Sequence, residues 1–451
     1  DIETADRNMD AAVIGDALDF TFIGSGYVAH GDLLGAHGSN DEGNAIALDS
    51  SGRILVTGYG WNYHSSDVVD PFLVPYTAMV IWRFNPDGTL DKTFNNEGYV
   101  THHGAAGGDG GDRGNAIALD AKERIIVAGV AENASGRSDL AIWRLNPDGS
   151  LDTTFDSMGY VIHDNAAGGS SWDGGGDIAI DSLGRIVVVG VSNGPNEIPY
   201  MTVWRYNDDG TPDTTFNGAG FVTHKGAEAG TRGSHGNAIA LDASEKIVVV
   251  GDSDARYLTI WRFNPDGTLD PAFNTTGFVI NDTADGINSG GSGNDLVIDA
   301  LGNMLIAGIS GNTNGNTDVT IWKFHPDGTP DTTFNGTGCV VHDNAAGGNS
   351  HDRGTAIALD QMGRVLATGY SFNSLGYSPD MAIWRFNADG TLDTTFNGRG
   401  YLTHRISGAG NYEDIANEII LDSSGRVLVV GKGTAVPGEE SSSDMVIWRF
   451  K

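Results

Sequence analysis

One 24-residue phrase recurs along this chain and constrains its fold more than any other feature. Residues 79–102 read MVIWRFNPDGTLDKTFNNEGYVTH, and residues 140–163 read LAIWRLNPDGSLDTTFDSMGYVIH. The tryptophan of the phrase occurs at seven positions, spaced by 57 to 64 residues: Trp82, Trp143, Trp204, Trp261, Trp322, Trp384 and Trp448. A period of this size indicates a repeat architecture.

Each repeat contains four short apolar runs separated by turn residues. In the first complete copy the runs are Ala45–Asp49, Arg53–Gly58, Met79–Asn85 and Tyr99–His102. They are too short for helices and rich in β-branched and aromatic residues, while DSSGR and NPDG supply turn chemistry between them. We therefore predict an all-β fold, a single seven-bladed β-propeller with four antiparallel strands per blade.

The two ends of the chain divide one repeat between them. Residues 18–30, LDFTFIGSGYVAH, resemble the tail of a repeat, and the chain stops at MVIWRFK, where such a tail would follow. We predict that Tyr27–His30 pairs beside Met445–Phe450 and closes the last blade, which removes an open sheet edge. The single domain then spans residues 1–451, with an N-terminal extension at 1–17, a closing segment at 18–30 and blades along 43–451.

The combined pattern resembles the delta-60 repeat, a bacterial propeller repeat. The resemblance rests on AIALD, GRI and IWRFNPDGTLD followed by TF and GYV, and it covers essentially residues 15–451. Where that family has a polar tail such as QPDGK, this chain has DSSGR or DASEK. The resemblance implies a propeller, usually in secreted or surface proteins, and it transfers no catalytic residue.

Charge and cysteine content limit the possible partners and the cellular location. Lys plus Arg is 26 and Asp plus Glu is 59, a net charge of −33. Such a chain should repel nucleic acid and anionic membranes. Cys339 is the only cysteine, and no apolar run approaches the length of a membrane helix. Since the chain begins at Asp1 rather than Met, we expect a mature protein that is secreted, periplasmic or on the cell surface.

Residues present in every repeat are interpreted as scaffold. The basic residue after each tryptophan predicts a ring of charge pairs, in which Arg144 reaches Asp120 or Asp152. The histidines that end the fourth strands predict hydrogen bonds to the loops that follow them. Asp112, with counterparts at Glu42 and Asp352, predicts a loop-fixing hydrogen bond, and Cys339 replaces a core aromatic residue as a buried small hydrophobe.

Function is expected on the face that carries the long, variable loops, because a binding site should depart from the repeat. These loops are rich in aromatic and acidic residues and are most unusual in the sixth, seventh and first blades. The candidate binding residues are Trp61, Tyr63, His64, Phe72, Tyr76, Trp172, Phe372, Tyr377, Tyr412, Glu413 and Asp414.

Two classes of function fit this surface. The first is a non-enzymatic binding or scaffold propeller for a protein or glycan partner. The second is a polysaccharide-active enzyme, a glycoside hydrolase or lyase, with carboxylates on the same face. HExxH, GxSxG and phosphate-binding loops are missing from the sequence, which favours the first class. We expect no organic cofactor, and we expect calcium in the variable loops rather than in the NPDG turns.

Overall fold

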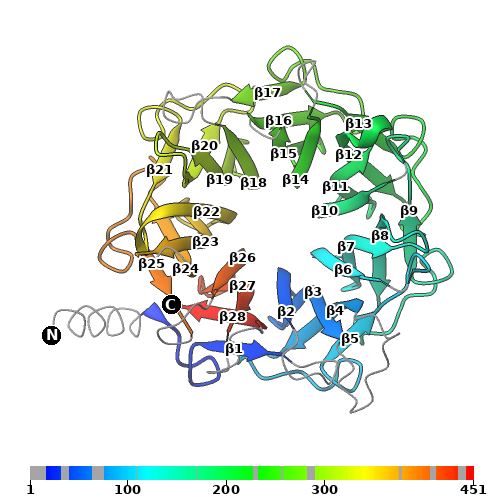
Figure 1. Ribbon diagram of the computed structural model, residues 1–451, viewed down its shortest axis with the longest axis horizontal. Helices are drawn as coiled ribbons and strands as arrows, with labels where there is room; N and C mark the ends of the chain where they lie inside the picture. Colours follow the sequence, from blue (N-terminus) through cyan, green and yellow to red (C-terminus); the bar gives the residue numbers. More distant parts are fainter. Residues whose placement is uncertain are drawn as a thin grey trace.

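The computed structural model shows an all-β ring. It describes residues 17–31, 40–62, 76–108, 110–169, 171–226, 232–254, 257–281, 290–374, 378–406, 413–434 and 443–451. Seven four-stranded antiparallel sheets surround a central axis, with their innermost strands facing it (Figure 1). The predicted fold class and blade number are confirmed. Within the described ranges, no helix is long and apolar enough to cross a membrane.

The strands follow one order in every blade, from the axis outward. The innermost strands are β2 (Asp41–Leu48), β6 (Arg113–Leu119), β10 (Asp173–Ile180), β14 (Ser234–Leu241), β18 (Gly291–Ile298), β22 (Gly347–Leu359) and β26 (Ile415–Leu421). The second strands are β3 (Ile54–Asn62), β7 (Ile125–Glu132), β11 (Ile186–Asn193), β15 (Ile247–Ser253), β19 (Met304–Gly311), β23 (Val365–Asn373) and β27 (Val427–Gly433). The third strands are β4 (Tyr76–Phe84), β8 (Ser138–Leu145), β12 (Pro199–Tyr206), β16 (Tyr257–Phe263), β20 (Thr317–Phe324), β24 (Pro379–Phe386) and β28 (Asp444–Phe450). The outer strands are β5 (Tyr99–His102), β9 (Tyr160–His163), β13 (Phe221–His224), β17 (Phe278–Asn281), β21 (Cys339–His342), β25 (Tyr401–His404) and β1 (Tyr27–His30).

The N-terminal strand closes the ring. β1 pairs antiparallel with β28, with Tyr27 opposite Trp448 and His30 opposite Met445. Blade 7 therefore consists of β26, β27, β28 and β1, whereas blades 1 to 6 are continuous in sequence. The C-terminus lies beside this blade (Figure 1). The predicted closure is confirmed, and it joins the two ends of the chain in one sheet.

The hydrophobic core lies between neighbouring blades rather than in one central mass. The tryptophan of each repeat is almost fully buried. One cluster joins Val56 and Trp82 of blade 1 to Val430 and Ile447 of blade 7, and six similar clusters connect the other blades. The ring is therefore held by seven comparable interfaces, each filled by the same repeated positions.

The ring of charge pairs is confirmed, and of the two predicted partners of Arg144 the structure selects Asp152. Arg144 is 1% exposed, and its Nε lies 2.9 Å from Asp152 Oδ2. Asp120 instead binds Arg124, four residues later in the chain. The guanidinium of Arg144 also lies 4.6 Å from the centre of the Phe155 ring. The equivalent pairs are Arg83–Asp91, Arg205–Asp213, Arg262–Asp270, Lys323–Asp331, Arg385–Asp393 and Arg449–Asp19.

Three of the histidines that end the outer strands make a contact that the sequence did not predict. His102 Nδ1 accepts a hydrogen bond from Trp143 Nε1 of the next blade at 3.2 Å. The same contact joins Trp261 to His224 at 3.3 Å and Trp384 to His342 at 3.1 Å. The buried indole nitrogen needs an acceptor, so these histidines link neighbouring blades. The predicted bond to the following loop is found at His224, whose Nδ1 also accepts the Gly226 N–H at 3.3 Å. The predicted burial of Cys339 is confirmed.

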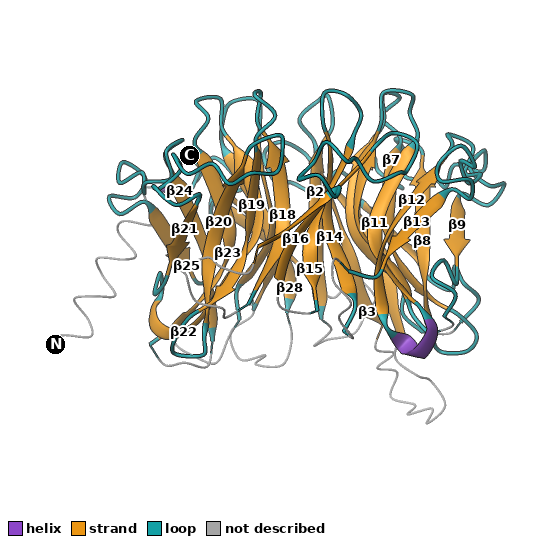
Figure 2. Cartoon of the chain, turned by 90° about the horizontal axis from the view of Figure 1, so that it is seen from above, coloured by secondary structure: helices purple, strands orange, loops and turns teal. Residues whose placement is uncertain are grey.

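The two faces of the ring differ in their connections. The turns between first and second strands are short, whereas the connections between third and fourth strands, such as residues 85–98, are longer but uniform in length. Both sets lie along the upper edge of Figure 2, and this face is called the uniform face below. The other connections lie on the opposite face, where the 3-10 helix η1 (Pro195–Glu197) is also found (Figure 2). This second face is called the variable face below, and its strand ends carry the candidate site.

Candidate functional site

A β-bulge in every innermost strand shapes the central channel. In blade 1 the pairing of β2 with β3 shifts between Gly43 and Ala45, which leaves Asn44 as the extra residue. The Asn44 side chain donates to the Gly114 carbonyl of the next blade at 2.8 Å. Side chains at the same position join most other neighbouring blades: Asn115, Asn237, Asn294, Thr355 and Asn417. These residues form the bulge ring.

Blade 3 departs from the bulge ring. Its extra residue is Gly176, which has no side chain to reach the next blade. The position still faces that blade, because a Cβ there would lie 3.3 Å from the Gly236 carbonyl oxygen. Gly174 and Gly175 precede it, so three consecutive glycines form this part of the channel wall. The sequence departure therefore coincides with open space at the mouth of the channel.

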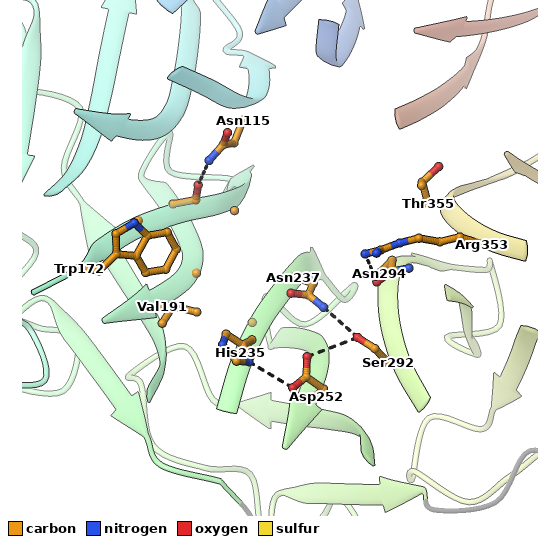
Figure 3. A pocket seen from close by; sticks show the side chains of 15 residues that line it. Asn115, Trp172, Val191, His235, Asn237, Asp252, Ser292, Asn294, Arg353 and Thr355 are labelled. Carbon is orange, nitrogen blue, oxygen red and sulfur yellow. Dashed lines mark hydrogen bonds and ion pairs between the residues drawn. The ribbon is translucent and has the colours of Figure 1, made fainter. Parts of the chain in front are cut away.

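The first cavity occupies this opening on the variable face and is called the channel-mouth cavity. It has a volume of about 550 Å³. Its walls come from the starts of β6, β10, β14 and β18, the middle of β22 and the ends of β11 and β15 (Figure 3). The lining residues are Asn115, Trp172, Gly174, Gly175, Gly176, Gly190, Val191, His235, Gly236, Asn237, Asp252, Ser292, Asn294, Arg353 and Thr355.

A chain of polar contacts orders one wall of this cavity. His235 Nδ1 lies 3.2 Å from Asp252 Oδ1, and Ser292 Oγ donates to Asp252 Oδ2 at 3.4 Å (Figure 3). Asn237 Nδ2 lies 3.3 Å from the same serine oxygen. On the opposite wall, the Arg353 guanidinium donates to Asn294 Oδ1 at 3.4 Å. The cavity therefore presents amide, imidazole, carboxylate and guanidinium groups in fixed positions.

The second cavity adjoins the first and is called the rim cavity. Its volume is about 540 Å³, and it lies over blades 1 to 3 of the variable face. Its lining residues are Trp61, Tyr76, Thr77, Gly110, Gly111, Arg113, Asn115, Val130, Glu132, Ser138 and Trp172. Asn115 and Trp172 belong to both cavities, so the two form one groove with the Trp172 indole at their junction.

Trp172 is held in this position although it is 41% exposed. Its backbone forms a parallel bridge with Ser138, and its carbonyl accepts the Asn193 N–H at 2.8 Å. The indole lies over Gly174, where a Cβ would come within 3.1 Å of the ring. Glycine at 174 therefore leaves room for the indole next to the chain, and the indole remains partly exposed.

Three acidic side chains lie deeper in the channel, one residue after the bulge. Asp177, Asp295 and Glu418 occur in blades 3, 5 and 7, where the other blades have alanine. Their carboxylates accept the backbone N–H groups of Ile239, Ile357 and Ile46 in the following blades, each at 2.8 Å.

These three channel acids hold protons more tightly than usual. Burial raises the pKa of Asp177 to about 6. Burial and repulsion from Asp177 raise the pKa of Asp295 to about 7. Burial and repulsion from both aspartates raise the pKa of Glu418 well above its usual value. Because the acids sit on non-adjacent blades, their repulsion acts across the channel.

The structure groups only some of the candidate binding residues. Trp61, Tyr76 and Trp172 line the rim cavity together. Phe372 packs at 6.0 Å from the Tyr370 ring, and Glu413 is exposed on blade 7. Asp414 is buried, and its Oδ2 accepts the Ile406 N–H. Tyr63, His64, Phe72, Tyr377 and Tyr412 lie outside the described residues.

Sequence reasoning missed the polar residues of the groove. His235, Asp252 and Ser292 stand at the variable-face ends of blades 4 and 5, while the sequence drew attention to blades 6, 7 and 1. The replacement of Asn by Gly176 inside a repeated phrase was the available signal.

The predicted loop-fixing bond is confirmed at Asp112, which accepts the Ala105 N–H. Asp41 rather than Glu42 holds the equivalent position in blade 1, three residues before the bulge.

Neither cavity offers the carboxyl pair of a glycosidase within the described part of the chain. Asp252 is the carboxylate lining the channel-mouth cavity, and Glu132 is the one lining the rim cavity. Two groups of three aspartates lie elsewhere on the same face, at the junctions of blades 2 and 3 and of blades 5 and 6. These groups offer oxygen ligands for a metal ion.

A family model described as a β-propeller domain of unknown function, DUF5122, matches six segments of the chain: residues 50–94, 124–155, 184–216, 245–273, 302–334 and 363–396. A second model, described as a β-propeller repeat, matches residues 33–64. The chain belongs to this family of β-propeller repeats. The resemblance to the bacterial delta-60 repeat is thereby confirmed, and in this DUF5122 propeller each matched segment contains the second and third strands of one blade.

Solved structures resemble the DUF5122 propeller in fold alone. A protein of unknown function from Dyadobacter fermentans is 13% identical with a TM-score of 0.43, covering 94% of this chain and 97% of that one. An ulvan lyase is 11% identical with a TM-score of 0.45, and the match covers 90% of this chain and 94% of that one. A gluconolactonase from Xanthomonas campestris is 16% identical with a TM-score of 0.32, and the match covers 73% of this chain and 83% of that one. No curated protein sequence matches the chain.

Proposed function

We propose that this propeller is a secreted or cell-surface binding module that holds a glycan in the groove formed by the channel-mouth and rim cavities. The observation that carries the proposal is the exposed Trp172 indole where the two cavities meet. Each cavity falls within the size range of ligand sites. Together they form a groove suited to an extended chain of sugar units rather than to one small molecule.

The chemistry of the groove suits a neutral or weakly charged sugar chain. Aromatic side chains such as Trp61, Tyr76 and Trp172 offer apolar faces on which the C–H faces of sugar rings can pack. Asn115, with the other amides of the groove, can both donate to and accept from hydroxyl groups. The net charge of −33 disfavours polyanionic ligands, which is a further reason to expect neutral glycans.

Replacing Trp172 by Ala should weaken glycan binding by at least about tenfold, because a central aromatic anchor commonly contributes more than ~1.4 kcal/mol. The measurement is a screen of immobilised neutral oligosaccharides, followed by calorimetry with the best binder. Phe20→Ala is the matched control, since Phe20 is 49% exposed and belongs to the N-terminal closing segment outside both cavities. Equal binding by the two variants, or no binder in the screen, would contradict the proposal.

The His235–Asp252 pair supports a second candidate, a polysaccharide-active enzyme. The carboxylate orients the imidazole, as in many general bases, and Arg353 lies on the facing wall (Figure 3). A lyase needs such a base, whereas a hydrolase of the usual kind needs two carboxyl groups in one cavity. Incubation with polysaccharides tests this alternative: cleavage that disappears in His235→Gln supports it, and binding without cleavage favours the binding module.

A further inference from the structure

A seven-residue sequence occurs twice at corresponding places on the variable face. Residues 163–169 and residues 342–348 both read HDNAAGG. Each copy ends an outer strand and leads to the innermost strand of the next blade. The first joins β9 to β10 between blades 2 and 3, and the second joins β21 to β22 between blades 5 and 6. Both copies carry an aspartate directly after the strand, Asp164 and Asp343.

At the first junction three carboxylates converge. Asp139, Asp164 and Asp173 each have an oxygen within 4.8 Å of one from each of the others. Asp173 is 1% exposed, and its Oδ2 accepts the Asn165 N–H at 2.9 Å. Its buried Oδ1 has no hydrogen-bond partner. Within the described residues, neither Lys nor Arg forms an ion pair with this group. A buried, unpartnered carboxylate oxygen costs stability unless something binds it.

The second junction repeats this arrangement. Asp318, Asp343 and Asp352 also have oxygens within 4.8 Å of one another. Asp352 is 1% exposed, its Oδ2 accepts the Asn344 N–H at 2.7 Å, and its Oδ1 has no hydrogen-bond partner. Burial, followed by repulsion from Asp343 and Asp318, raises the pKa of Asp352 to about 7. The same unfavourable concentration of negative charge therefore occurs in two independent places.

A third junction shows how the fold balances such a group. Between blades 6 and 7, Asp380 and Asp414 hold the positions of the two buried aspartates, and Arg405 holds the position of Asp164. Arg405 Nε donates to Asp380 Oδ1 at 2.8 Å. The residues at this position between blades 1 and 2 and between blades 3 and 4 are His103 and Lys225. Where the protein supplies an acid instead, a cation from outside the chain can supply the balancing positive charge.

We propose that the two HDNAAGG junctions each bind one divalent, oxygen-preferring cation, for which calcium is the best fit. Two ligands of one calcium ion at about 2.4 Å are at most about 4.8 Å apart, which agrees with the carboxylate spacing. The groups contain neither the imidazole nor the thiolate that zinc prefers. Three carboxylates supply three to six of the six to eight oxygen ligands of calcium.

The test uses the full chain after treatment with a chelator, titrated with CaCl₂ at fixed ionic strength. Two bound calcium ions per chain are expected from these sites, with a rise in melting temperature when calcium replaces the chelator. Asp164→Asn and Asp343→Asn should each remove one ion or weaken its binding at least tenfold, and the double variant should lose both. Glu97→Gln, at an exposed position in the connection between β4 and β5, on the face opposite the variable face, is the control and should retain both.

Two further variants use the third junction as a guide. Asp164→Arg should remove one ion. After chelator treatment this variant should melt at a higher temperature than the chelator-treated parent, because the guanidinium supplies the positive charge that calcium otherwise supplies at this junction. Arg405→Asp should add a calcium ion. Absence of binding at millimolar calcium, or binding that the double variant retains, overturns the proposal. If only one of the two Asn variants loses an ion, the proposal is wrong for the junction whose variant keeps both ions.

Discussion

Replacing Arg144 by Ala should destabilise the protein by up to about 3–5 kcal/mol, because it removes the closer partner of the buried Asp152 and leaves Arg124 at 3.6 Å. Burial acts to raise the pKa of Asp152, but hydrogen bonds from Thr154 and the charge of Arg144 outweigh it and lower that pKa. The ion pair therefore contributes stability above the unfolded pKa of the aspartate, and this contribution is lost as pH falls through the folded value. Melting temperatures at pH 7 should show the full effect.

The repeat supplies its own control for this experiment. Lys323 stands at the position of Arg144 in blade 5, and its Nζ lies 3.2 Å from Asp331. Arg144→Lys should therefore keep the charge pair and cost less than Arg144→Ala, although it loses the contact with Thr154. Equal destabilisation by both substitutions would show that packing against Phe155, rather than charge, determines the contribution.

Replacing Asp295 by Ala should stabilise the protein by about 2–4 kcal/mol at pH 8. The substitution introduces the residue that blades 1, 2, 4 and 6 carry at this position, and it relieves repulsion with Asp177 and Glu418. The pKa of Asp295 is about 7 in the folded state and near 4 in the unfolded state. The folded protein thus binds more protons between these values, and its stability falls as pH rises through them.

The pH profile distinguishes this explanation from a general packing effect. The stabilisation by Asp295→Ala should be absent at pH 4, grow between about pH 4 and 7, and remain constant above that range. Melting temperatures of both proteins at matched ionic strength measure it. A constant difference at every pH, or a loss of stability at pH 8, would contradict the assigned repulsion and would indicate that the bond to the Ile357 N–H is more important.

Local repetition explains why so much of the fold was predictable. Each blade repeats the same strand and turn signals, so seven copies of a weak pattern give one strong prediction. The ring of charge pairs followed from the same logic, because each repeat places the two charges eight residues apart, Arg144 on β8 and Asp152 in the connection that follows it. The choice between Asp120 and Asp152 needed side-chain direction, since Arg124 occupies the first of them.

The candidate site was only partly predictable, because its residues come from different blades. Trp61, Tyr76 and Trp172 were recognised individually as unusual aromatics, but their common cavity depends on how β3, β4 and the start of β10 meet. His235 and Asp252 are seventeen residues apart in sequence and appeared as ordinary loop residues. Their pairing depends on the antiparallel register of β14 with β15.

The sequence by itself determined the blade number, the closure by Tyr27–His30 and the acidic charge of the chain. Those properties depend on periodicity and composition, which can be read from the order and number of residues alone. Only the tertiary structure decided that Asp177, Asp295 and Glu418 repel one another across the channel and that Arg405 is the counterpart of Asp164. Such relations depend on the curvature of a closed ring, which brings residues from separate blades to one axis or to equivalent junctions.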